Sequence, residues 1–322
     1  MIQKVKNMAK QNAVLYNMYL KLYSVAMKNL TEINPVLATK LLYRKAVGHK
    51  LNLKNPVAMT EKMQWLKLNQ YRNHPLVTMC ADKYRVREFI QKKGCPEILN
   101  ELYGVWDKFE DIDFQKLPKK FVLKCNHGCG YNLICEDKDR FDLKMAEKKI
   151  NKWMKERYGK ETAELVYDQI ERKIICEKFM ESEDGEPLKD YKIFCSYGVP
   201  KLIYVVTGGH GEGMCLDYYT TDWKWIPVRN GQLPNAQTKR KKPELLKEML
   251  NYAKVLSADF PLVRVDLYCE FGKIFFGELT FLATGGMFHL KPQKYDKIFG
   301  EMFSIPIHEK RGGRRKHGDN TE

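Results

Sequence analysis

The sequence predicts an α+β protein in which helices cover antiparallel-rich sheets. Two observations indicate this class. Apolar residues recur at helical spacing in the first part of the chain, and short strands joined by tight turns dominate the second part. A third observation bounds the size: 322 residues exceed one average domain, so we expect two packed lobes or one domain with an extension.

The first part of the chain is helical and strongly basic. Residues 1–93 hold 18 Lys or Arg and 4 Asp or Glu, and so carry +14 of the chain's net charge of +16. An amphipathic helix is expected first, and two interpretations of it stay open: an arm packed on the body, or an interfacial helix on an anionic membrane surface. Its apolar positions are Val14, Leu15, Met18, Tyr19 and Leu22. Further helices are expected over 60–69 and 81–93.

The second part alternates short strands with helices. Strands are expected over 121–124, 133–135, 173–180, 191–196, 201–206, 261–270 and 273–280, and helices over 142–157, 162–171 and 243–256. The stretch 208–213 is a glycine-rich loop, and 309–322 is expected to be a disordered basic tail.

Composition excludes several classes of protein. Hydrophobic residues make up 44% and charged residues 30%, which excludes global disorder and a membrane bundle. Nine scattered cysteines predict reduced thiols. Cys125, His127 and Cys129 have no second ligand pair at a metal-binding spacing, so zinc is not expected. Without a secretory signal or an apolar run of about 20 residues, a soluble cytoplasmic protein is expected.

Two carboxylates stand out in the last strand pair. Alternation places Arg264 and Asp266 on one strand face, and a tight hairpin brings Glu278 close to Asp266. Two neighbouring carboxylates in an apolar sheet repel each other, and Mg²⁺ together with phosphate oxygens is the usual remedy. Because the charges would otherwise repel, we expect amide replacements to leave folding intact. The alternative is that Asp266 forms structural ion pairs with Arg264 or a lysine.

A glycine-rich loop follows the strand that ends at Lys124. Gly128 and Gly130 let backbone N–H groups approach phosphate oxygens, and the lysine supplies a compact charge. The spacing is not that of a Walker loop. An ordinary β-turn is the alternative.

Several short segments, in this order and spacing, resemble the ATP-grasp superfamily and within it the teichuronopeptide-biosynthesis, TupA-like branch. The resemblance covers roughly residues 50–300. The segments are Glu61–Leu66, Asp82-Lys83 with Arg87 and Gly94, Phe121–Lys124 with its glycines, Ile175–Met180, Asp190–Lys192, Asp222-Trp223, Arg264–Tyr268 and Gly277–Phe281.

The resemblance implies an ATP-grasp fold: two α+β lobes clasping ATP, with a basic helical N-terminal extension. It implies an N-terminal region over 1–75 and an ATP-grasp domain over 76–308, divided into a lid lobe (116–180) and a catalytic lobe (181–308). The loops 128–132 and 208–213 would act as mobile lids.

The resemblance also implies site residues, with ATP and Mg²⁺ as cofactors. The phosphates would be held by Lys83, Lys124, Gly128 and Gly130, and adenine and ribose by Glu177, Lys178, Met180 and Asp190. Arg264 and Lys192 would be catalytic, and the metal would be held by Asp266, Glu278 and Thr280. Thr280 departs from the asparagine common at its position, which leaves the second magnesium and the acceptor pocket open.

The activity implied is ATP-dependent carboxylate–amine ligation through an acyl phosphate. The expected partners are a carboxylated cell-envelope polysaccharide or sugar acid and an amine or amino acid, with an anionic membrane surface for the N-terminal region. No specific nucleic acid is expected. Two alternatives stay open: a glycosyltransferase of polysaccharide biosynthesis, whose acidic motif would be Asp137-Lys138-Asp139, and a non-catalytic nucleotide- or polyanion-binding protein.

Overall fold

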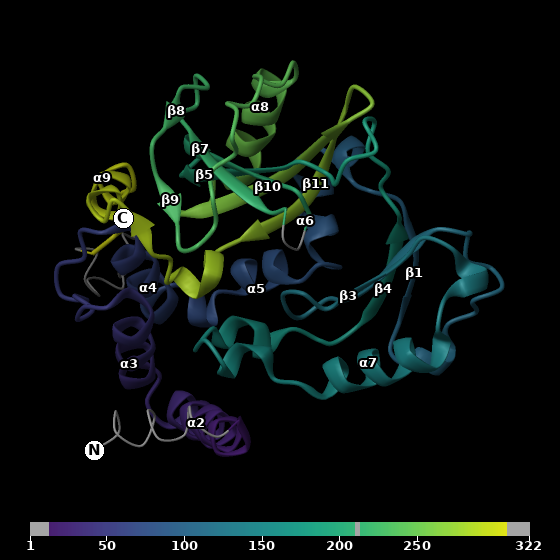
Figure 1. Ribbon diagram of the computed structural model, residues 1–322, viewed down its shortest axis with the longest axis horizontal. Helices are drawn as coiled ribbons and strands as arrows, with labels where there is room; N and C mark the ends of the chain where they lie inside the picture. The colour runs from purple at the N-terminus through teal and green to yellow at the C-terminus, as the bar shows by residue number, and fades with distance from the viewer. Residues whose placement is uncertain (1–12, 210–212, 308–322) are drawn as a thin grey trace, which may run out of the picture.

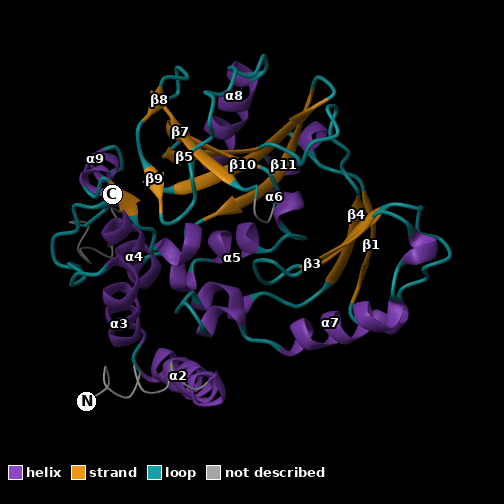
Figure 2. Cartoon of the chain, viewed as in Figure 1, coloured by secondary structure: helices purple, strands orange, loops and turns teal. Residues whose placement is uncertain are grey.

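The computed structural model describes residues 13–209 and 213–307, and two separate sheets organise them (Figure 1). Helices cover the outer faces of both sheets and fill the space beside them (Figure 2). The predicted α+β class is therefore confirmed. The predicted tail over 309–322 and the centre of the 208–213 loop lie outside the described residues.

The smaller sheet has four antiparallel strands in the order β1-β4-β2-β3. Burial alternates along β2, so Phe121 and Leu123 point to the same face of the sheet. They form a hydrophobic core with Ala146 and Ile150 of α7, which packs on that face. Asp142 begins that helix by accepting a hydrogen bond from the backbone of Met145. The elements are β1 (Leu102–Trp106), β2 (Phe121–Cys125), β3 (Asn132–Cys135), β4 (Ile174–Lys178) and α7 (Leu143–Lys155).

The larger sheet has six antiparallel strands in the order β11-β10-β5-β6-β7-β8. Helix α8 packs on β5, β6 and β10 with buried residues such as Met249, on the side of the sheet where the fully buried Val265 and Ile193 pair. The elements are β5 (Asp190–Ser196), β6 (Val199–Thr207), β7 (Cys215–Tyr219), β8 (Trp225–Ile226), α8 (Leu246–Ser257), β10 (Val263–Glu270) and β11 (Lys273–Thr280), with a separate pair β9 (Arg229–Asn230) and β12 (Leu290–Lys291).

The N-terminal helices are tied to the body at several points. The backbone N–H and hydroxyl of Thr60 donate to the buried Asp296 at 3.0 and 2.6 Å, which joins α4 to α9. Gly48, with φ of 93°, ends α3 in the left-handed region that glycine adopts without strain. The helices are α2 (Ala13–Ile33), α3 (Pro35–Val47), α4 (Met59–Asn69), α5 (Pro75–Ala81), α6 (Val86–Lys92) and α9 (Lys294–Glu301).

Two predicted helices are wrong in extent or type. The helix expected over 81–93 is broken at Asp82, whose side chain accepts from the backbone N–H groups of Tyr84 and Arg85 and turns the chain. The one expected over 162–171 is the short 3₁₀ helix η6. The 3₁₀ helices are η1 (Tyr71–Asn73), η2 (Pro96–Ile98), η3 (Phe109–Asp111), η4 (Lys138–Arg140), η5 (Tyr158–Lys160), η6 (Leu165–Gln169) and η7 (Ala283–Gly286).

Candidate active site between the two sheets

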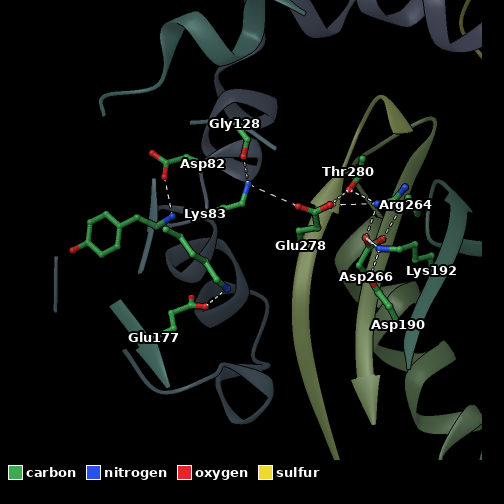
Figure 3. Close-up of polar contacts among 12 residues, drawn as sticks. Asp82, Lys83, Gly128, Glu177, Asp190, Lys192, Arg264, Asp266, Glu278 and Thr280 are labelled. Atoms are coloured by element: carbon green, nitrogen blue, oxygen red, sulfur yellow. Dashed lines mark hydrogen bonds and ion pairs between the residues drawn. The ribbon is translucent and has the colours of Figure 1, made fainter. Parts of the chain in front are cut away.

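A cavity of about 300 Å³ lies between the two sheets and collects most of the predicted site residues. Strands β5, β10 and β11 supply one wall, and β2, β4 and the segment before α6 supply the other (Figure 3). The predicted residues that line it are Lys83, Lys124, Gly130, Glu177, Met180, Asp190, Lys192, Arg264, Asp266 and Glu278. Gly128 and Thr280 contact lining residues.

Strand register explains the wall formed by the larger sheet. Asp266 on β10 pairs with Glu278 on β11 and with Lys192 on β5, so the three side chains stand in one row across three strands. The predicted closeness of Asp266 and Glu278 is thus confirmed. A bulge at Gly277 sits beside this row, where an added Cβ would lie 3.1 Å from the carbonyl oxygen of Asp266.

Asp266 is buried and fully paired. Arg264 donates to both of its carboxylate oxygens at 2.6 Å, and the Lys192 ammonium donates to Oδ2 at 2.6 Å. Burial alone would lower the pKa of Lys192, but the Asp266 charge outweighs it and raises that pKa above its usual value. Asp266 therefore forms the ion pairs that the sequence left open as an alternative. Its charge is compensated, and the expected repulsion between two unpaired carboxylates does not arise.

Glu278 is the more accessible carboxylate. Its side chain is 36% exposed, and Thr280 donates a hydrogen bond to its Oε1 at 2.8 Å while accepting one from Arg264 at 2.9 Å. Burial would raise its pKa, but the charges of Lys83 and Arg264 prevail and lower the pKa of Glu278 to about 2. Thr280 therefore positions Glu278, a role that its hydroxyl performs without a metal.

Asp190 holds an unpaired oxygen at the edge of this network. Lys192 pairs with its Oδ2 at 2.5 Å, whereas its buried Oδ1 has no hydrogen-bond partner among the described residues. Burial raises the pKa of Asp190 to about 6 against the opposing effect of Lys192. A buried oxygen without a partner is uncommon and is able to accept a hydrogen bond. The ribose or substrate-side role of Asp190 stays a prediction.

The opposite wall presents two lysines. Lys124 forms an ion pair with Glu177 at 2.5 Å, and Arg87 approaches the other oxygen of Glu177 at 3.7 Å. The Lys83 ammonium donates to the carbonyl of Gly128 at 2.5 Å and lies 3.9 Å from Glu278. Lys83 therefore links the two walls, as Figure 3 shows.

Lys178 does not face the cavity. Its backbone N–H donates to the carbonyl of Glu101 at 2.9 Å, and its own carbonyl accepts from Asn100 at 2.8 Å. Its ammonium pairs with Glu101 at 3.5 Å, on the outer side of β4. The predicted contact of Lys178 with the nucleotide is thus not supported by this geometry, because both backbone groups are already bonded within the protein.

Several lining residues were missed by the sequence-based prediction. Tyr268 shares the strand face of Arg264 and Asp266 on β10, so alternation could have identified it. Leu99 and Phe276 carry no signal beyond hydrophobicity. Tyr204 contacts the network from β6, where Arg264 donates to its hydroxyl at 2.6 Å. Position 204 pairs with Lys192, and that register follows only from the folded sheet.

The alternative metal and sugar-nucleotide motifs have structural explanations. His127 is buried with Nε2 bonded to the carbonyl of Trp153, and no cluster of three or more metal-ligating side chains occurs within 13–209 and 213–307. In the Asp-x-Asp motif, Asp137 caps the turn η4 by accepting from the N–H of Asp139. Lys138 donates to three backbone carbonyls nearby.

Comparison with known proteins identifies the family. The family model of TupA-like ATP-grasp matches residues 61–304. The chain belongs to the TupA-like ATP-grasp family. Its fold is therefore the ATP-grasp fold, and members of the ATP-grasp family are carboxylate–amine ligases. The lobe boundaries given above stay predictions.

Solved structures resemble the chain distantly. They include D-alanine–D-alanine ligase from Bacillus anthracis complexed with ATP (16% identity, TM-score 0.41, 63% of this chain and 55% of that one). L-amino acid ligase from Bacillus licheniformis is similar (16%, 0.40, 70% and 47%). The ATP-grasp ligase PsnB, complexed with minimal precursor, Mg and ADP, is another (10%, 0.35, 69% and 57%). The chain thus spans about half the length of these proteins, and the family assignment rests on the family model.

No curated protein matches the chain. Among the described helices, none combines the length and the apolar character that crossing a bilayer requires.

Proposed function

We propose that the protein is an ATP-dependent carboxylate–amine ligase that attaches an amino acid to an acidic cell-envelope polysaccharide or its precursor. The observation that carries this proposal is the cavity between the sheets, where Lys83 and Lys124 face Lys192, Arg264 and two carboxylates. Membership of the ATP-grasp family supports ligase chemistry. The charge of the cavity supports anionic substrates.

The nucleotide would lie across the cavity with its base near Met180 and Phe276, which supply the apolar part of the lining. Its phosphates would meet Lys83 and Lys124 from the smaller-sheet wall. Lys124 currently pairs with Glu177, so a phosphate would take over that ammonium or share it. Either exchange replaces one charge-assisted contact by another.

The donor set fits a magnesium ion bound together with phosphate oxygens. Glu278 is ionised over the whole neutral range because its pKa is about 2. Among the described residues its Oε2 accepts no hydrogen bond, and the Lys83 ammonium lies 3.9 Å away. Asp266 lies next to it in register, but both of its oxygens accept hydrogen bonds from Arg264 and Lys192, so it would hold the ion only by exchanging one of these contacts. When bound, the ion would offset phosphate charge and align the γ-phosphate with the acceptor.

The residues of this chain perform the remaining work. Arg264 is held by Asp266, Tyr204 and Thr280, so its guanidinium is fixed before substrate arrives and would stabilise the phosphoryl group during transfer to the carboxylate. Lys192 would hold the substrate carboxylate or the transferred phosphate. The amine then displaces phosphate from the acyl phosphate to form the amide, with release of one proton.

The test is a substrate screen. The protein is incubated with MgATP, amino acids, and sugar acids or polyuronates, and release of ADP and phosphate is measured. Hydroxylamine should trap the acyl phosphate as a hydroxamate. Lys124→Gln should raise the ATP concentration needed, whereas Lys120→Gln, an exposed lysine of the same region that pairs with Glu181, should not. Nucleotide release from nucleotide sugars instead of ATP would contradict ligation and favour glycosyl transfer.

We further propose a cytoplasmic location, because the reaction consumes ATP. The polymer would approach the cavity as a polyanion, drawn by the basic character of the chain. An experiment with neutral and uronic polysaccharides of equal length separates charge attraction from specific recognition, since added salt weakens only the former.

A further inference from the structure

The outward face of α2 carries a row of exposed apolar side chains. Met18 is 53% exposed, Leu22 63%, Val25 56% and Ile33 83%. These positions follow helical spacing, so they lie on one side of the helix. Single exposed apolar residues are ordinary, but a continuous row of them marks an interaction surface.

The opposite face of α2 already packs against the protein. Met27 and Thr31 are buried there, and Lys28 forms an ion pair with Glu161 at 2.7 Å. Glu32 accepts from Arg157 at 2.9 Å. These contacts orient the helix. Glu32, seven residues after Val25, lies at the edge of the exposed row, and the apolar side chains of the row are left uncovered.

The exposed charge beside this row is cationic. Lys21 on α2 and Lys40 and Arg44 on α3 are exposed, and none of the three forms an ion pair within the described part of the chain. On α3, exposed Leu37 and Leu41 alternate with these cations at helical spacing. Glu32 is the single acidic residue of positions 13–47 in the sequence, and Arg157 neutralises it.

We propose that the outward surface of α2 and α3 binds an anionic lipid surface, with α2 lying along the interface. An apolar row beside unpaired cations matches acyl chains next to acidic headgroups, and 21 helical residues span about 30 Å along such a plane. A second copy of the chain fits less well. It would bring the same cations together, and Glu32, the one acidic residue of positions 13–47, is already paired with Arg157.

The test uses the full-length protein and sedimentation with two kinds of vesicle: phosphatidylcholine alone, and phosphatidylcholine with phosphatidylglycerol. The parent should bind the second kind at low salt. Replacing Leu22 and Val25 by serine should weaken binding about tenfold or more. Replacing Lys40 and Arg44 by glutamine should weaken it about fivefold per residue. Val199→Ser, at an exposed apolar position on β6, is the matched control and should bind like the parent.

Circular dichroism checks that every variant keeps its helices, and light scattering reports the oligomeric state. Equal binding of the serine variant and the parent overturns the proposal, as does a parent that ignores acidic vesicles. A dimeric parent whose serine variant becomes monomeric assigns the surface to a second copy instead. ATP consumption with a soluble acceptor should be unchanged in all these variants, so this test and that of the ligase activity fail independently.

Discussion

Replacing the two paired carboxylates one at a time separates a structural role from a metal-binding role. Asp266 is 1% exposed and receives three hydrogen bonds of 2.6 Å from Arg264 and Lys192. Asp266→Asn keeps the shape but removes the charge that both buried cations share, so that Lys192 keeps only Asp190 and Arg264 keeps only Glu278 at 3.3 Å. Breaking a buried ion pair in this way costs about 3–5 kcal/mol of unfolding free energy.

Glu278→Gln should behave differently. Its side chain is 36% exposed, and its nearest cations are Arg264 at 3.3 Å and Lys83 at 3.9 Å. Partly exposed pairs at these distances contribute about 0–1 kcal/mol, so unfolding free energy should change by no more than that. Turnover should nevertheless fall about a thousandfold, which corresponds to roughly 4 kcal/mol of transition-state stabilisation.

The assay combines turnover at several magnesium concentrations with urea unfolding of both single variants and the double variant. Because both residues serve one site, the double variant should turn over little more slowly than the worse single variant. Asp222→Asn removes an exposed carboxylate paired with Lys224 and should change neither quantity. The metal assignment is refuted if Glu278→Gln retains turnover within threefold of the parent with unchanged magnesium dependence.

Three further outcomes are expected. Lys83→Ala and Lys124→Ala should each raise the dissociation constant of ATP, measured by calorimetry, and parental affinity in both would contradict the nucleotide site. Burial raises the pKa of Glu164 to about 7, so this group stabilises the fold below pH 4.5 and loses that contribution as pH rises to 7. In urea unfolding at several pH values, Glu164→Gln should therefore remove up to about 3 kcal/mol of the fall in unfolding free energy over this range. A pH profile identical to that of the parent would refute this prediction. Gly286→Ala places a Cβ 2.6 Å from Nε2 of Gln64 at a φ of 68°, and should lower the melting temperature, which parental melting would contradict.

The sequence predicted the β10–β11 hairpin of the site well. Side-chain alternation and the position of the turn, both local features, determine which residues of the two strands meet. Asp266 and Glu278 are twelve residues apart and meet in register, as expected. The ion-pair alternative named a lysine as partner of Asp266 but did not identify which one. Lys192 lies 74 positions away, and only the pairing of β5 with β10 brings it there. For that reason the sequence suggested repelling carboxylates where the structure contains a compensated network.

The break at Asp82 shows a second limit. Apolar periodicity extends through this region and predicts one helix over 81–93. A side chain that hydrogen-bonds to nearby backbone N–H groups competes with helix formation, and Asp82 does so toward Tyr84 and Arg85. Asn126, which directly follows β2, donates a further hydrogen bond to the same carboxylate at 2.8 Å. This turn directs Lys83 toward Gly128 and Glu278, so the departure from the helical pattern is what positions a site residue.

The charges around the cavity give a physical reason to expect a bound cation under the proposed ligase function. Five basic and four acidic side chains line the cavity, so its walls carry a net charge of about +1 when all are ionised. Most of the basic groups are engaged by acidic ones, and Arg264 is bonded to Asp266, Thr280 and Tyr204. These contacts hold the hydrogen-bond donors in place before substrate binds, so binding need not order them. They also leave little unpaired positive charge for a triphosphate and a carboxylate. Under the proposed function, a divalent ion held by Glu278 would supply that charge. The charged residues that line the cavity are Lys83, Arg87, Lys124, Glu177, Asp190, Lys192, Arg264, Asp266 and Glu278.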